Sequence, residues 1–82
     1  MAEFRYVIKD EIGIHARPAG MLVKLVKSFD CAVEISKGEK TADASKLMAV
    51  MGLGAKKGDE IVVKSDDGEA LEKLKDFFEQ NL

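Results

Sequence analysis

The sequence contains one cysteine, one histidine, one proline and no tryptophan among its 82 residues. A lone cysteine, Cys31, cannot form an internal disulfide, which is typical of proteins in a reducing compartment. Because there is no second histidine or cysteine, the chain lacks the ligands of a structural zinc site, and we expect neither a metal nor another cofactor. The phosphate-binding P-loop pattern is also missing, so ATP binding of that kind is not expected.

Long hydrophobic runs and an excess of positive charge are missing as well. No apolar stretch approaches the roughly 20 residues of a membrane helix. The N-terminus alternates as FRYVI, unlike the basic head and apolar run of a signal peptide. These features predict a soluble, cytoplasmic protein with no inserted membrane segment. With 13 basic and 15 acidic residues the net charge is −2, which argues against nucleic acid as a partner.

The hydrophobic content of 46% is enough for the core of one small domain, residues 1–82. Period-two alternation predicts strands at residues 3–10, 31–36, 39–43 and 59–64. Helical periodicity predicts helices from after Gly13 to near Asp30, within residues 45–54, and over residues 66–82. The order β-α-β-β-α-β-α, with helices long enough to cover one face of the strands, predicts a two-layer α/β sandwich.

The stretch GIHARPAG, residues 13–20, places the histidine at the entrance of the first helix. Pro18 suits the first turn of a helix, because its missing N–H would have no acceptor there. Free backbone N–H groups and the positive end of the helix dipole make this entrance a site for anions. His15 would be held toward its neutral, nucleophilic form, and Arg17 could bind two phosphate oxygens. These parts are sufficient for a phosphohistidine carrier. The spacing alone leaves open that His15 is a cap or a solvated residue and Arg17 a surface charge.

The same stretch resembles the active-site motif of HPr, the phosphocarrier family of the phosphoenolpyruvate-dependent sugar phosphotransferase system. SKLMAVMGLGAKKGDEI, residues 45–61, is similar to the family's second-helix region. The resemblance covers nearly the whole chain and needs no gap through the first 64 residues. It implies an open-faced β-sandwich (α+β), in which a four-stranded antiparallel sheet is covered on one face by three helices.

The resemblance also implies the roles of the motif residues. His15 would accept phosphate on Nδ1 from the phosphohistidine of enzyme I and pass it to IIA domains of sugar permeases. Arg17 would stabilise the phosphoryl group, the backbone amides of Ala16 and Arg17 would bind it, and Pro18 would fix the helix start. The protein would thus be a stoichiometric carrier and not an enzyme.

A second group of residues is interpreted as a docking surface. Residues Leu47, Met48 and Met51 are spaced like core residues, but Val50 and Leu53 are free to face inward in their place. HPr-like proteins use this region to dock onto partners, which exposed methionines suit because they adapt to different surfaces. We expect a patch with Ala19, Gly20 and Lys24 at its edge. Lys24, Lys27 and Lys46 would surround it with positive charge and attract acidic partners.

The expected partners are enzyme I and IIA domains, with an HPr kinase or a transcription regulator as further candidates, and the chain is expected to be a monomer. Two alternatives remain: a regulatory module of the HPr fold that acts by docking, and a carrier in a nitrogen-type regulatory chain. The sequence does not separate the latter from sugar transport, because the chemistry at His15 would be the same.

The chain departs from the family at the start of the second helix. Many HPr proteins carry lysine and then a regulatory serine there, whereas here Ser45 precedes Lys46. We therefore predict that regulation at the usual position is absent. Ser45 is expected to cap the helix, with Asp43 as a rival cap.

Overall fold

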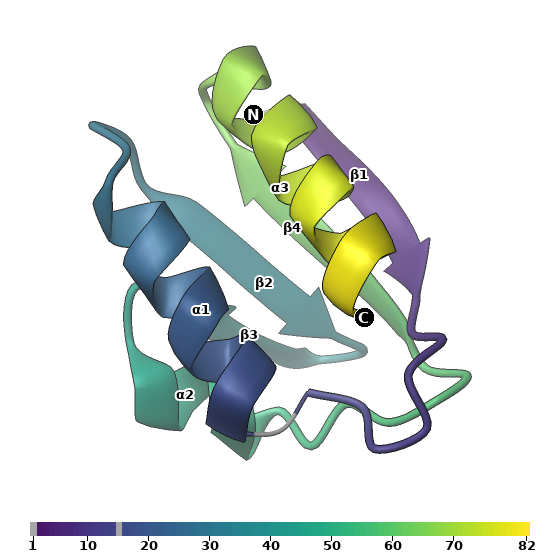
Figure 1. Ribbon diagram of the computed structural model, residues 1–82. Coiled ribbons are helices and arrows are strands. Elements are labelled where there is room, and N and C mark those ends of the chain that lie inside the picture. The colour runs from purple at the N-terminus through teal and green to yellow at the C-terminus, as the bar shows by residue number, and fades with distance from the viewer. Residues whose placement is uncertain (1, 15) are drawn as a thin grey trace.

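The computed structural model describes residues 2–14 and 16–82 and confirms the predicted element order (Figure 1). The elements are β1 (Ala2–Val7), α1 (Ala16–Lys27), β2 (Val33–Lys37), β3 (Lys40–Asp43), α2 (Leu47–Gly52), β4 (Glu60–Ser65) and α3 (Gly68–Asn81). None of the helices in the described part is long and apolar enough to cross a membrane.

The four strands form one antiparallel sheet in the order β1-β4-β2-β3. Strand β2 shows why this sheet has two different faces, because Val33 and Ile35 are buried while Glu34 and Ser36 point to the opposite side. Gly38, with φ of 59°, lies in the turn that joins β2 to the short edge strand β3. Strands β2 and β3 therefore form a hairpin.

The helices lie on one face of the sheet, so the predicted open-faced sandwich is also confirmed (Figure 1). Leu22 of α1 and Leu74 and Phe78 of α3 are almost fully buried against the sheet. The ring of Phe78 packs edge-on against Phe4 and Tyr6 of β1. Helix α2 contacts β3 and α1. This packing places the start of α1, α2 and the end of α3 around the same end of the molecule.

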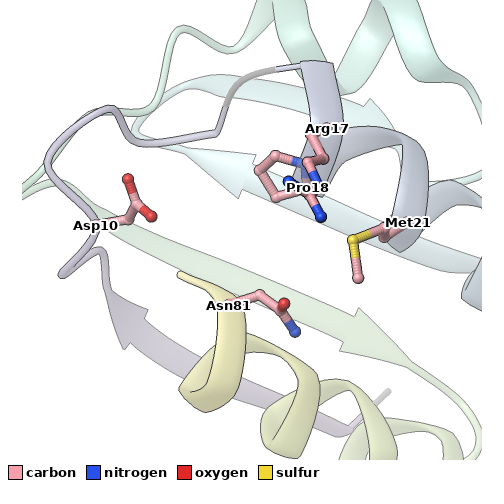
Figure 2. Close-up of a pocket in the computed structure, with 5 residues that line it drawn as sticks. All are labelled: Asp10, Arg17, Pro18, Met21 and Asn81. Carbon is pink, nitrogen blue, oxygen red and sulfur yellow. The ribbon is translucent and has the colours of Figure 1, made fainter.

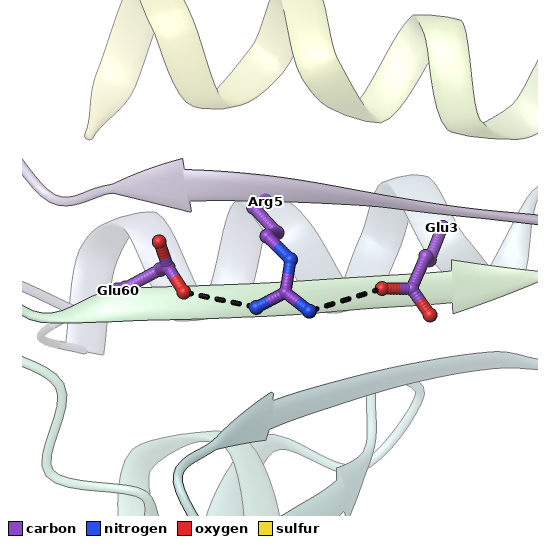
Figure 3. A network of polar contacts seen from close by, with 3 residues as sticks. All are labelled: Glu3, Arg5 and Glu60. Atoms are coloured by element: carbon purple, nitrogen blue, oxygen red, sulfur yellow. Dashed lines mark hydrogen bonds and ion pairs between the residues drawn. The ribbon is translucent and has the colours of Figure 1, made fainter.

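The other face of the sheet is open and carries a small charge network (Figure 3). Arg5 of β1 forms ion pairs with Glu60 at 3.1 Å and with Glu3 at 3.7 Å. All three side chains are well exposed, so the network contributes little to stability. Arg5 thus lies on the face of the sheet that the helices leave uncovered.

Helix α1 ends at Lys27 and not near Asp30, where the periodicity predicts its end. The Ser28 hydroxyl and backbone N–H both donate to the Leu25 carbonyl, three residues earlier. This tighter bonding ends the regular helix, although the apolar pattern continues.

Candidate functional site

Residues 8–14, which follow β1, are held by hydrogen bonds. The Asp10 carboxylate accepts the backbone N–H of Ile12 at 2.9 Å, and the Asp10 carbonyl accepts that of Gly13 at 3.0 Å. Gly13 has φ of 79°, and the N–H of Ile14 then donates to the Ala55 carbonyl at 3.0 Å. These hydrogen bonds therefore fix the path of the backbone that leads to the start of α1.

The loop of residues 53–59, whose Ala55 carbonyl accepts the Ile14 N–H, is held by polar contacts of its own. Asp59 accepts the backbone N–H of Lys56 at 2.8 Å and pairs with the Lys37 ammonium at 3.1 Å. The hydrogen bond from Lys56, and then the one from Lys37, lowers the pKa of the Asp59 carboxyl, which stays ionised at neutral pH. Lys37 also donates to the Gly54 carbonyl. Because Lys37 belongs to β2, its contacts with Asp59 and Gly54 connect this loop to the sheet.

His15, the predicted phosphoryl acceptor, lies outside the described residues, and its role stays a prediction. The residues that follow it confirm the predicted helix entrance. Ala16 and Arg17 open α1 and are exposed, whereas Pro18 is buried in the first turn. The first turn contains no acidic residue. Its backbone N–H groups have no acceptors within the helix, so this end of α1 attracts an anion.

A hollow of about 250 Å³ lies beside this helix start (Figure 2). It is lined by Asp10, Arg17, Pro18, Met21 and Asn81. Among residues 2–14 and 16–82, no carboxylate forms an ion pair with Arg17. The Asp10 carboxylate accepts the N–H of Ile12, and the Asn81 amide donates to the Phe77 carbonyl. The planar fork of an arginine can bind two oxygens of a phosphate group, so Arg17 has the chemistry that a phosphate site requires.

The residues of the predicted docking patch on α2 differ in exposure. Met48 is 79% exposed and Leu47 is 40% exposed, while Val50 and Leu53 are buried, as expected. Met51 is half-buried and packs against the core. Leu47 and Met48, together with the exposed part of Met51, form an apolar surface that we call the α2 patch.

The other predicted patch residues, on α1, differ in burial and in position. Ala19 is fully buried in the core, so its place at the edge of the patch is wrong. Lys24 lines a largely apolar hollow of about 430 Å³ that also involves Phe77 of α3. Gly20 and Lys27 do not line this hollow. Successive residues of a helix are rotated by about 100° around its axis, which places Gly20 and Lys27 to one side of the α1 residues that do line it.

The three lysines are all exposed, but they lie beside different elements. Lys24 lies toward α3, and Lys46 occupies the N-cap position of α2. That Lys24, Lys27 and Lys46 surround the α2 patch with positive charge stays a prediction.

The prediction that Ser45 or Asp43 caps α2 is wrong. Lys46 is the N-cap residue, and its side chain makes no capping hydrogen bond. The Asp43 carboxylate accepts both the hydroxyl of Ser45 at 2.7 Å and its backbone N–H at 2.9 Å. The hydroxyl hydrogen bond is the main reason that the pKa of Asp43 is lowered. Serine and aspartate satisfy each other in the turn before the helix, so neither reaches the amides of α2.

Sequence reasoning overlooked Asp10, Ile12 and Asn81. An aspartate two residues before Ile12, followed by Gly13, is a recognisable turn signal for the first two. No local signal marks Asn81, because it reaches the hollow only through the packing of α3 beside α1. The described residues include no group of three side chains that could hold a metal ion.

Comparison with known proteins agrees with this geometry. A family model described as "PTS HPr component phosphorylation site" matches residues 2–80. The phosphocarrier protein HPr of Mycoplasma capricolum is 37% identical over 70 residues, which cover 85% of this chain and 79% of that protein. The phosphocarrier protein HPr of Chlamydia pneumoniae is 39% identical over 75 residues, which cover 88% of this chain and 69% of that protein.

The fold is similar to solved structures as well. The crystal structure of HPr-C-His from Thermoanaerobacter tengcongensis matches with a TM-score of 0.91 and 31% identity. The match covers 98% of this chain and 93% of the other. Sequence and fold therefore agree over almost the entire chain.

Proposed function

The chain belongs to the HPr family, and from this we propose that it accepts a phosphoryl group on His15 from phosphorylated enzyme I and passes it to IIA domains of sugar permeases during phosphoenolpyruvate-dependent sugar uptake. The observation that carries the proposal is the arginine two residues after the histidine. Its guanidinium lies at a hollow beside the start of α1 with no carboxylate paired to it among the described residues.

The proposed transfer follows from these groups. The neutral imidazole of His15 attacks phosphorus with its Nδ1 lone pair, and the phosphorus–nitrogen bond in enzyme I breaks as the new bond forms. The phosphoryl group arrives beside the amides of Ala16 and Arg17 and the Arg17 fork, which stabilise its charge. The reverse exchange with a IIA histidine or other acceptor restores the free imidazole. The chain is thus a carrier and not a catalyst, and we expect it to act in the cytoplasm as a monomer.

The test is incubation with phosphoenolpyruvate and enzyme I, followed by mass spectrometry of the intact protein. We expect a gain of one phosphoryl group that is lost in acid and kept in base. His15→Ala should prevent the gain while the far-ultraviolet circular dichroism stays unchanged. An unchanged mass of the wild type, or label that persists in His15→Ala, contradicts the proposal.

Met48→Asp should weaken docking without weakening the fold. Because Met48 is 79% exposed, its replacement should change the free energy of unfolding by less than about 0.5 kcal/mol. The new charge would be desolvated against the partner and would repel an acidic one, raising KM for transfer by about tenfold or more. The measurement is the rate of phosphorylation against concentration of this protein.

Val7→Asp is the matched control, because it adds the same charge at a 48% exposed residue of the sheet. It should leave KM unchanged. Met51→Asp is less informative, since Met51 packs against the core and its loss should also lower stability. A wild-type KM for Met48→Asp would remove the α2 patch from the docking surface.

Ser45 should be modified by an HPr kinase weakly or not at all. Its hydroxyl is hydrogen bonded to the Asp43 carboxylate, and a phosphate there would face that negative charge. The measurement is phosphate mapping by fragmentation after incubation with kinase and ATP. The double variant Ser45→Lys, Lys46→Ser restores the usual order and should be modified efficiently. Efficient modification of the wild type at Ser45 would show that the kinase tolerates the shift.

A further inference from the structure

Ile12 is the most unusual exposed residue near the proposed site. It is 67% exposed, and of the large hydrophobic residues that the structure describes only Met48 exposes more of its surface. Burying an isoleucine stabilises a fold, so leaving it in water gives up stability that the core would gain. One exposed isoleucine is ordinary on its own. Its setting is what requires an explanation.

The segment that carries Ile12 is held on both sides. The N–H groups of Lys9 and Asp10 donate to the Leu82 carbonyl at 2.6 and 2.8 Å, and Ile14 is buried and bonded to Ala55. The Ile12 N–H is itself bonded to Asp10. The backbone therefore presents this side chain to solvent in a defined position.

The charged neighbours of Ile12 each make one polar contact. Glu11 pairs with Lys57 at 3.7 Å, and the carboxylate of Asp10 is directed to a backbone N–H. A protein that covers Ile12 would therefore meet an apolar side chain beside one exposed ion pair and one carboxylate that keeps its negative charge.

The segment also lies where a phosphotransfer partner must be. Ile12 is three positions before His15, so chain connectivity keeps their Cα atoms within about 11 Å. A standard interface covers about 800 Å² on each protein, a disc of about 16 Å radius. A partner centred on residue 15 therefore reaches Ile12. In Figure 1 this segment runs on the side of the α1 start that faces away from α2.

We infer that Ile12 is an apolar anchor for enzyme I, in contact with an apolar depression beside the donor's phosphohistidine. The inference rests on the proposed function. It extends the docking surface to both sides of the phosphoryl site, with the α2 patch on one side and Ile12 on the other. Two apolar contacts that flank the reacting residue fix the orientation of the donor more firmly than one patch.

The test is the steady-state rate of phosphorylation by enzyme I and phosphoenolpyruvate as the concentration of this protein is varied. Ile12→Ala should raise KM about tenfold and leave kcat unchanged, because a contact made equally before and during transfer is lost. Ile12→Leu should restore a KM near that of the wild type. Val7→Ala, at the exposed aliphatic residue of the sheet, should have no effect. All three should unfold within a few degrees of the wild type.

The outcomes are distinct. A KM for Ile12→Ala within twofold of the wild type overturns the inference, and so does an equal rise in Val7→Ala. A lower kcat at unchanged KM would assign Ile12 to the transfer step and also contradict it. Failure of the proposed function is seen without any of these variants, because the wild type would then acquire no phosphate, and the anchor would fail with it.

Discussion

Gly13→Ala is expected to lower the free energy of unfolding by about 2–5 kcal/mol. A Cβ at this position would lie 2.3 Å from the Ala55 carbonyl oxygen and 2.7 Å from the Lys56 Cα, both backbone atoms. The φ of 79° adds the strain of a left-handed conformation. Because a domain of this size is stable by only about 5–15 kcal/mol, the loss is a large fraction of the total. Urea unfolding followed by circular dichroism measures it.

Gly54→Ala is the control that separates the two causes. Gly54 also has a positive φ, 64°, but an added Cβ would meet no atom within 4 Å. Its replacement should cost only the backbone strain, about 1–2 kcal/mol. An equal decrease in the free energy of unfolding for the two variants would mean that the segment before α1 shifts at little cost. The close contact of Gly13 with Ala55 would then be unimportant. The larger loss at Gly13 would show that this contact fixes the helix entrance.

The fold was predictable because its signals are local. Alternation in β2 and the spacing of Leu71, Leu74 and Phe78 in α3 each specify which face is buried, and the structure buries those residues. The helix entrance was predictable for the same reason, since Pro18 marks the first turn by its own chemistry.

Contacts between distant segments were not predictable. Asn81 lines the hollow of Arg17 although the two are 64 positions apart in sequence. The Ala55 carbonyl accepts the Ile14 N–H across 41 positions, and no local pattern pairs either set of residues. The prediction of the N-cap of α2 was wrong for a different reason. Ser45 and Asp43 are both good caps, and the sequence does not show that they bond to each other.

Arg17→Ala is expected to slow phosphoryl transfer by about 10- to 100-fold and to leave the fold intact. A hydrogen bond to a charged group contributes about 1.5–3 kcal/mol, and each 1.4 kcal/mol of lost transition-state stabilisation is tenfold in rate. Arg17 is exposed and has no carboxylate partner among the described residues, so the free energy of unfolding should change by less than about 0.5 kcal/mol. Rapid-quench measurement of transfer from enzyme I gives the rate.

Arg5, the other arginine of the chain, is the matched control. Arg5→Ala removes the same charge from the open face of the sheet, where Glu3 and Glu60 already pair with it (Figure 3). It should leave the transfer rate unchanged. Arg17→Lys keeps the charge but loses the planar fork, so its rate should fall between those of Arg17→Ala and the wild type. If Arg17→Lys matches the wild type, charge alone is sufficient. If Arg17→Ala matches it, the backbone amides at the start of α1 stabilise the phosphoryl group without the arginine.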